Sequence, residues 1–167
     1  EDFAKLMNEK AASLGCKDTW FITPNGLDAV QAGDETKEGT TEKSHSTTAA
    51  DLARIMRYCV MESPQKEMFL QITQTQDYSF TDLSGNRSFS CHNHNALLTM
   101  FTGALSGKTG FTGKAGYCYI GAASREGKTL VVALLASGWP PHKTYKWSDC
   151  RKLLDYGFDN YSLYTLD

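Results

Sequence analysis

Apolar side chains recur at helical spacing in two early segments of the chain. Within residues 2–14 they return every three or four positions, and Gly15 follows as a stop signal. In the second segment, a hydroxyl among residues 46–48 can cap a helix whose apolar face holds Leu52, Ile55, Met56 and Cys59. The pattern predicts two amphipathic helices, and Pro64 either ends the second or opens another.

Residues 16–44, between these helices, show little periodicity. They are rich in Gly, Pro, Asn, Thr and charged side chains. We expect a long irregular loop there, and loops of that length in a compact domain are usually functional.

Period-two alternation begins after the second helix. Tyr78 and Phe80 alternate with polar residues, residues 84–86 carry a turn signal, and Phe89 lies on the return. This pattern predicts an exposed hairpin over residues 76–91.

A second strand-rich segment follows. Strands are predicted at residues 105–111, 116–124 and 129–137. The last two form an antiparallel pair around a tight turn at residues 125–127, and the almost unbroken apolar third strand requires cover on both faces. A helix over residues 145–156 can supply one cover.

The order of elements predicts the α+β class, with helices first, then a mainly antiparallel sheet and a closing helix. We expect a single partial domain over residues 1–167. Its parts are a helical region at about residues 1–75, the hairpin at about 76–92, and the sheet with its closing helix at about 93–158.

Composition narrows the function classes. The 167 residues are 41% hydrophobic and 22% charged, which is typical of one soluble globular domain. The net charge of -2 lacks the basic excess of nucleic-acid-binding proteins, and the longest apolar run, residues 130–136, is too short to span a bilayer. The first residues carry no initiator Met or export signal and look like a helix already under way, so we expect a truncated chain.

The cysteine pattern argues against a metal site or a disulfide scaffold. Five cysteines are scattered without CxxC spacing. Cys59 and Cys118 lie among apolar neighbours and are expected to be small buried hydrophobes. Cys-His-Asn-His at residues 91–94 offers zinc-type ligands, but an extended strand points neighbouring side chains in opposite directions, so we interpret it as a polar strand end. We expect no metal and no cofactor.

Lys108-Thr109-Gly110 lies on the first strand of the sheet. On an edge strand, such a triplet offers an ammonium, a hydroxyl and a backbone without a side chain, so an anionic peptide can lie alongside it. The three residue types are common, so the triplet taken alone is a weak signal and favours a plain strand.

Seven blocks of sequence give the triplet a context. They are residues 3–8 with 14–15, 19–21, 24–28, 46–53, 93–98, 107–112 with 115–117, and 153–158. In this order they resemble the D-alanyl-D-alanine carboxypeptidases among the low-molecular-mass penicillin-binding proteins. The resemblance covers nearly the whole chain and implies the β-lactamase/transpeptidase-like fold, an antiparallel sheet covered by helices, with its N-terminal portion missing.

Enzymes of that family carry Ser-x-x-Lys, with the nucleophile, then Ser-x-Asn, then Lys-Thr-Gly. Residues 63–66 and 84–86 match the first two motifs in letters only. In the family register Ser63 caps a helix that opens with Pro64, and residues 84–86 form the hairpin turn. The resemblance implies that the nucleophile lies outside this chain.

The resemblance also assigns roles in acyl transfer, in which an upstream serine attacks the carbonyl between two terminal D-alanines. Lys108 adds positive potential near the serine of Ser-x-Asn, the Thr109 hydroxyl receives the substrate carboxylate, and Gly110 leaves room for the ligand backbone. The amide of Phe111 is one of two oxyanion donors. Penicillins enter the same place because their strained amide and carboxylate mimic the dipeptide end.

One position departs from the family pattern. Family members commonly carry an arginine before the final helix as a further carboxylate contact, and counting back from residues 153–154 places Lys146 there, after an unusual Trp-Pro-Pro-His segment at residues 139–142. Lysine lacks the bidentate fork of arginine. Lys146 is therefore either a weaker substrate contact or a solvated lysine at a helix start.

The favoured interpretation is part of an exported serine-type carboxypeptidase of the cell envelope, which acts on peptidoglycan pentapeptides ending in D-Ala-D-Ala and binds β-lactam antibiotics. The alternatives are a non-catalytic relative that serves as an envelope or sporulation binding module, and a β-lactamase. Alone, the chain is expected to be inactive. Because a central helix of the family fold is missing, we expect it to pair with the N-terminal part of the same protein, to self-associate or to be poorly stable.

Overall fold

A three-stranded antiparallel sheet forms the centre of the computed structural model, which describes residues 2–36 and 39–164, without the side chains of residues 34–40. The strands are β5 (Ala104–Thr112), β6 (Gly116–Arg125) and β7 (Lys128–Leu134), in the order β5-β6-β7. Short turns join them, with Glu126 and Gly127 at positive φ in the second turn. The predicted strands and their tight turn are confirmed.

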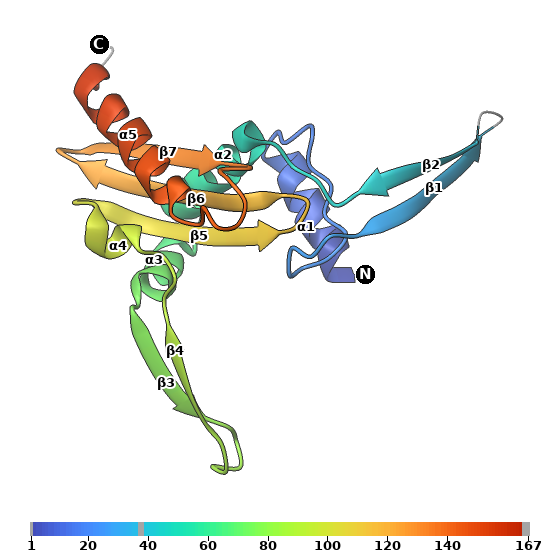
Figure 1. Ribbon diagram of the computed structural model, residues 1–167, viewed down its shortest axis with the longest axis horizontal. Coiled ribbons are helices and arrows are strands. Elements are labelled where there is room, and N and C mark those ends of the chain that lie inside the picture. The colour runs from blue at the N-terminus through green and yellow to red at the C-terminus, as the bar shows by residue number, and fades with distance from the viewer. Residues whose placement is uncertain (1, 37–38, 165–167) are drawn as a thin grey trace.

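Helices cover both faces of this sheet (Figure 1). One face carries α5 (Tyr145–Asn160) and the short α4 (Leu97–Met100), and the other carries α2 (Ala49–Arg57) and α3 (Lys66–Gln74). Strand β7 contacts both α5 and α2, so the predicted double cover of the apolar strand is confirmed. Helix α4 has only four residues and was not predicted.

Each face has its own apolar core. The larger core, under α5, contains Leu97, Phe101, Tyr119, Ala123, Val132, Cys150 and Leu154. The smaller one, under α2, is formed by Met56, Val60 and Ala122. Neighbouring residues of β6 therefore serve opposite cores, as the alternation of side chains along a strand requires.

The predicted N-terminal helix is confirmed as α1 (Asp2–Ser13), and Gly15 follows it at a φ of 77°. Its Ala4 and Ala11 are buried, whereas Phe3 and Leu6 are exposed. Asn8 ties the helix to the following loop, because its side chain accepts from the amide of Phe21 at 2.7 Å and donates to its carbonyl at 2.8 Å.

The second predicted helix is α2, capped by the Thr48 hydroxyl, which accepts a hydrogen bond from the amide of Asp51. A π-helical turn, η1 (Tyr58–Glu62), extends it. Helix α3 then begins after Pro64, so that proline opens a further helix.

The expectation of an irregular loop over residues 16–44 is wrong for its second half. Strands β1 (Val30–Thr36) and β2 (Gly39–Ser44) form an antiparallel hairpin that projects from the body (Figure 1). Its sequence is almost wholly polar, so neither face carries the apolar stripe from which a half-buried strand is recognised. Residues 16–29, the first half of the expected loop, lack regular structure apart from a bridge between Trp20 and Ser46.

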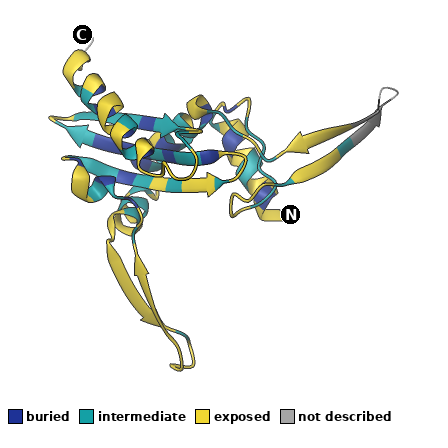
Figure 2. Cartoon of the chain, viewed as in Figure 1, coloured by how far each residue is buried: buried dark blue, intermediate teal, exposed yellow. Residues whose placement is uncertain are grey.

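The other predicted hairpin is confirmed as β3 (Asp77–Thr81) and β4 (Ser88–His92). It extends away from the body, and every strand residue is exposed (Figure 2). Its turn is held by the Asp82 carboxylate, which accepts from the Ser84 hydroxyl and the Asn86 amide.

All five cysteines are free thiols. Cys16 and Cys150 are buried, whereas Cys59 and Cys118 are only half-buried, so their expected full burial is wrong. Among the described residues, no helix combines the length and the apolar character needed to cross a membrane.

Candidate functional site

The Lys-Thr-Gly triplet lies in the middle of β5, at the edge of the central sheet. Thr109 pairs with Tyr119 and Gly110 with Cys118 on β6. On its other side, β5 has no neighbouring strand among the described residues. The triplet therefore lies on an open edge, where an extended peptide can add to the sheet.

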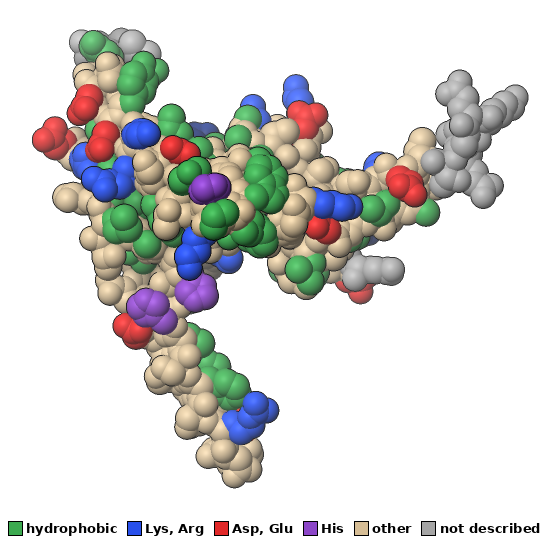
Figure 3. All heavy atoms as spheres, in the orientation of Figure 1, with side chains coloured by type: hydrophobic (Ala, Val, Ile, Leu, Met, Phe, Trp, Pro, Cys, Tyr) green, Lys and Arg blue, Asp and Glu red, His purple; other side chains and the backbone are tan. Residues whose placement is uncertain are grey.

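A hollow of about 180 Å³ lies beside the triplet. It is lined by His92, Asn93, His94, Asn95, Gly107, Lys108 and Thr109. In Figure 3, histidine and Lys or Arg side chains gather on this face, above the root of the β3–β4 hairpin. The hollow thus has basic and hydrogen-bonding walls.

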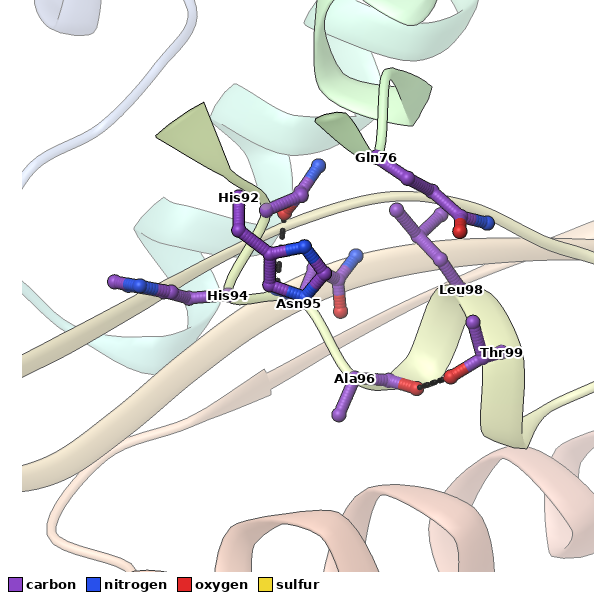
Figure 4. A pocket seen from close by; sticks show the side chains of 8 residues that line it. Gln76, His92, His94, Asn95, Ala96, Leu98 and Thr99 are labelled. Carbon is purple, nitrogen blue, oxygen red and sulfur yellow. Dashed lines mark hydrogen bonds between the residues drawn. The ribbon is translucent and has the colours of Figure 1, made fainter. Parts of the chain in front are cut away.

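A larger hollow of about 300 Å³ shares residues 92–95 with the first (Figure 4). Gln76, Leu98 and Thr99 also line it. Both hollows are lined by residues 92–95, at the end of β4 and just after it. We call residues 92–95 the ridge, because they separate the two hollows.

Asn93 fixes this ridge to the end of α3. Its amide donates to the carbonyls of Thr73 and Thr75 at 2.8 and 3.0 Å, and its Oδ1 accepts from the amide of Asn95. The imidazole of His92 is paired with the Asp77 carboxylate at 2.7 Å. The Asn93 bonds therefore attach the ridge to the end of α3, and the His92 pair joins the two strands of the hairpin.

Asn95 connects the ridge to the centre of the sheet. It is buried, and its Oδ1 accepts a 2.9 Å hydrogen bond from the hydroxyl of Tyr119. The Tyr119 ring lies over Gly107, where an added Cβ would come within 2.1 Å of that hydroxyl. A glycine at position 107 is therefore required for the ring to reach across β5.

The side chains of the triplet divide between the two faces of the sheet. Lys108 lies opposite Ile120, which packs against the core under α2. Thr109 lies opposite Tyr119, whose ring contacts Trp147 of α5 at 5.1 Å between centroids. Lys108 is exposed and Thr109 half-buried, and the two still meet at the hollow on the strand edge.

The sequence profile of the family described as D-alanyl-D-alanine carboxypeptidase matches residues 1–137. The chain belongs to this family. Solved structures of this family align with the chain at 32% and 30% sequence identity. They confirm the penicillin-binding fold that the resemblance implies.

Two solved structures and one curated relative illustrate the similarity. The chain is 36% identical over 156 residues to the D-alanyl-D-alanine carboxypeptidase DacB2 of Mycobacterium tuberculosis, covering 91% of this chain and 46% of the relative. The structure of a D-alanyl-D-alanine carboxypeptidase from M. tuberculosis H37Rv aligns with a TM-score of 0.74 and 32% identity, over 98% of this chain and 56% of that one. Penicillin-binding protein D2 of Listeria monocytogenes, in its cefotaxime-bound form, aligns with a TM-score of 0.70 and 30% identity, over 94% and 55%. The chain spans about half the length of these relatives.

Gly110 of the triplet has no packing reason to be glycine. An added Cβ there would meet only the Cβ of Cys118, at 3.9 Å, which is an ordinary contact. The face of the sheet over Gly110 is thus left open, in contrast to the crowded position at Gly107.

Lys146 is buried, with 8% of its surface exposed. Its ammonium lies 4.9 Å from the ring centroids of both Tyr117 and Trp147. Burial, and to a lesser degree the charge of Lys143, lowers the pKa of Lys146. The alternative of a solvated lysine is therefore wrong, and Lys146 does not line the hollow beside Lys108.

Ser63 and Ser84, which match the family motifs in letters only, both form local hydrogen bonds. The Ser63 hydroxyl accepts from the amide of Gln65 at 3.1 Å in the turn before α3. The N-cap of α3 is Gln65, so the expectation that Ser63 caps this helix with Pro64 at its first position is wrong. Ser84 lies in the β3–β4 turn. Neither lines the hollow beside the triplet.

Sequence reasoning missed the ridge residues His94 and Asn95 as part of the site. Both belong to a block on which the family resemblance rests, residues 93–98, but nothing in that block indicates contact with residues 107–109. The contact depends on the Tyr119 bond across the sheet. Among the described residues, no group of three His, Cys, Asp or Glu side chains is placed to hold a metal ion.

Proposed function

We propose that this chain forms one wall of the active site of a serine-type D-Ala-D-Ala carboxypeptidase. The observation that carries the proposal is the hollow beside Lys108 and Thr109 on the open edge of β5, in a chain that belongs to the carboxypeptidase family. An ammonium and a hydroxyl at such an edge suit the free carboxylate of an extended peptide.

In this proposal the substrate terminus lies antiparallel to β5. The Thr109 hydroxyl donates to the carboxylate, and the exposed Lys108 ammonium supplies positive potential. Gly110 leaves room for the peptide backbone, because the space beside it is open. Lys146 lies over the Tyr117 ring, on the face of the sheet that Thr109 shares, and is proposed as a further contact to the carboxylate.

The amide of Phe111 is proposed to stabilise the oxyanion. The carbonyl of Thr109 accepts a 2.5 Å hydrogen bond from the Lys108 ammonium, which suits a carbonyl on the free side of the strand. Main-chain groups two residues apart point to the same side of a strand, so this bond supports an outward-facing amide at Phe111. Loss of such a donor costs about 3 kcal/mol in the transition state.

The nucleophile is proposed to lie in an upstream segment of the intact protein, with Ser-x-x-Lys and Ser-x-Asn. That serine attacks the carbonyl between two D-alanines, the last D-alanine leaves, and water hydrolyses the acyl-enzyme. The substrate would be a peptidoglycan stem peptide of the cell envelope, and β-lactams would acylate the same serine. The chain covers 46% of one family relative and 56% of another, so each relative carries further sequence that this chain does not match.

Labelled penicillin tests this function. The chain alone should form no covalent adduct, whereas the chain joined to its upstream segment should be labelled. In the joined protein, Thr109→Val should slow acylation at least about tenfold, because a hydrogen bond to a charged carboxylate is lost. Thr102→Val, an exposed threonine just before β5, is the matched control and should change nothing.

Each other outcome has a distinct meaning. An adduct on Ser63 would overturn the assignment of the nucleophile to the upstream segment. A joined protein that binds D-Ala-D-Ala peptides without acylation would be a binding module. Rapid hydrolysis of the penicillin adduct would indicate a β-lactamase.

A further inference from the structure

Three exposed aromatic side chains surround the end of the β5–β6 pair. Phe111 is 47% exposed, Trp139 43% and Tyr145 50%. Figure 3 shows hydrophobic side chains gathered on this part of the surface, where the β5–β6 turn meets the segment before α5. We call Phe111, Trp139 and Tyr145 the aromatic shelf.

The rings of the shelf are anchored by contacts although they are exposed. The Trp139 indole N–H donates to the carbonyl of Gly113 at 2.9 Å, and its ring packs so closely on the backbone that a Cβ at Gly116 would come within 2.9 Å. The Phe111 ring lies 4.5 Å from that of Tyr117. Rings fixed in this way lose little conformational entropy when a ligand covers them.

Tyr145 is held by a stacking contact instead. Its ring stacks on His142 with 4.5 Å between centroids and an interplanar angle of 17°. Both Trp139 and Tyr145 come after residue 137, where the match to the family ends. The shelf is thus built largely by a segment that the family match does not cover.

The direction of the bound peptide leads to the shelf. This step rests on the proposed function, in which the carboxylate lies at Thr109 and the attacked carbonyl at the Phe111 amide. A peptide antiparallel to β5 advances about 3.4 Å per residue, so its third-from-last residue lies beyond Phe111, near Gly113. The Gly113 carbonyl is the group that holds Trp139.

We propose that the aromatic shelf is a specificity subsite for the side chain of the third-from-last residue of the substrate, and that it favours an aryl or long aliphatic side chain. An apolar side chain that covers the three rings removes apolar surface of both partners from water. The same contact favours β-lactams with a bulky apolar acyl group.

Peptide titrations followed by NMR test this subsite on the 167-residue chain. The probes are N-acetyl-L-Phe-D-Ala-D-Ala and N-acetyl-Gly-D-Ala-D-Ala, each as the free acid and as the C-terminal amide. The Phe acid should bind about fivefold more tightly than the Gly acid, from partial burial of one aromatic side chain. It should shift the Trp139 indole signal and show contacts between its phenyl protons and that ring.

Two variants remove the subsite and one serves as control. Trp139→Ala and, independently, Tyr145→Ala should reduce the Phe preference to less than about twofold without changing the affinity for the Gly acid. The Tyr145 variant keeps the Trp139 bond to Gly113, so it remains informative if Trp139→Ala unfolds the turn. Tyr164→Ala, which removes a tyrosine that is 87% exposed, should leave the preference intact.

The failures of the two proposals can be told apart. If both acids bind equally and shift signals of Lys108 and Thr109 only, the shelf proposal is overturned and the proposed function stands. If the free acids and the C-terminal amides bind with equal affinity, the proposed carboxylate site at Lys108 and Thr109 is overturned. The register of the bound peptide, on which the shelf proposal depends, is then overturned as well. If no probe shifts any signal at millimolar concentration, both proposals are overturned.

Discussion

The Tyr119 hydroxyl donates a buried 2.9 Å hydrogen bond to Oδ1 of Asn95, 24 residues earlier in the chain. The bond crosses β5 over Gly107 and joins the middle strand of the sheet to the ridge that lines the hollow. Burial raises the pKa of Tyr119, so the phenol remains a hydrogen-bond donor at all physiological pH values. The position of the ridge beside Lys108 thus depends on a side chain of β6.

Replacing Tyr119 with phenylalanine should lower the free energy of unfolding by about 1–2 kcal/mol, because Oδ1 of the buried Asn95 would keep only the long 3.3 Å bond from the amide of Leu97. Urea denaturation measures this change. Tyr164→Phe is the control, since Tyr164 is 87% exposed. Equal stability of the Tyr119 variant and the parent chain would show that the bond contributes nothing.

Gly107 and Gly110 should respond differently to alanine. Gly107→Ala should destabilise the chain by about 1–3 kcal/mol, because the new methyl group overlaps the Tyr119 hydroxyl at 2.1 Å and the Asn95 amide at 2.8 Å. Gly110→Ala should stay within about 1 kcal/mol of the parent, since its Cβ meets nothing closer than 3.9 Å. Thermal or urea unfolding of both variants checks the contrast, and similar losses would contradict it.

The stability of the chain should fall as the pH drops below neutral, in part through His45. Its Nδ1 accepts from the amides of Ile22 and Thr23, and burial lowers its pKa below the ordinary 6.5, although Asp28 acts in the opposite direction. The unfolded chain therefore binds a proton at a higher pH than the folded chain, so the stabilisation present above pH 6.5 is lost as the pH falls through the lowered value.

Urea midpoints at pH 7.5 and 5.5 measure this dependence. His45→Asn should show a smaller drop between the two pH values than the parent chain, while the other three histidines are unchanged in both proteins. An identical drop in the variant would rule out His45 as a source of the pH dependence.

Thiol reagents should modify Cys91 first. Cys91 is exposed on β4, whereas Cys16 and Cys150 are buried, and burial raises the pKa of Cys16 and raises that of Cys150 to about 12. Reaction of Cys91 with iodoacetamide should be more than about tenfold faster than that of Cys150, because the thiolate is the reactive form. Peptide masses after timed labelling give the order, and early modification of Cys150 in the folded chain would contradict it.

The sequence predicted those parts of the fold that bury apolar surface. Strand β7 was evident from its almost unbroken apolar run, and α2 from the spacing of Leu52, Ile55 and Met56. The β1–β2 hairpin was missed because its polar residues form strands without an apolar face. Helix α4 was missed because four residues are too few to show helical periodicity.

The lining of the hollow that forms the candidate site was predicted only in part, for a related reason. Lys108, Thr109 and Gly110 are contiguous, so a motif can identify them. His94 and Asn95 reach the hollow only because Tyr119 and the glycine at 107 bring the two segments together. A long-range contact of this kind leaves no periodic trace in either segment, and the sequence around residues 91–94 indicated only a polar strand end.

The larger core draws all of its buried members from one continuous stretch, Leu97 to Leu154. Segments that are near each other in sequence lose little conformational entropy when they come into contact. This favours a cooperative unit that forms early and opens last. Native-state hydrogen exchange should therefore be slowest for amides of β6 and α5. The helical region and the two projecting hairpins can exchange by local opening, so changes there would leave the scaffold that presents the triplet intact.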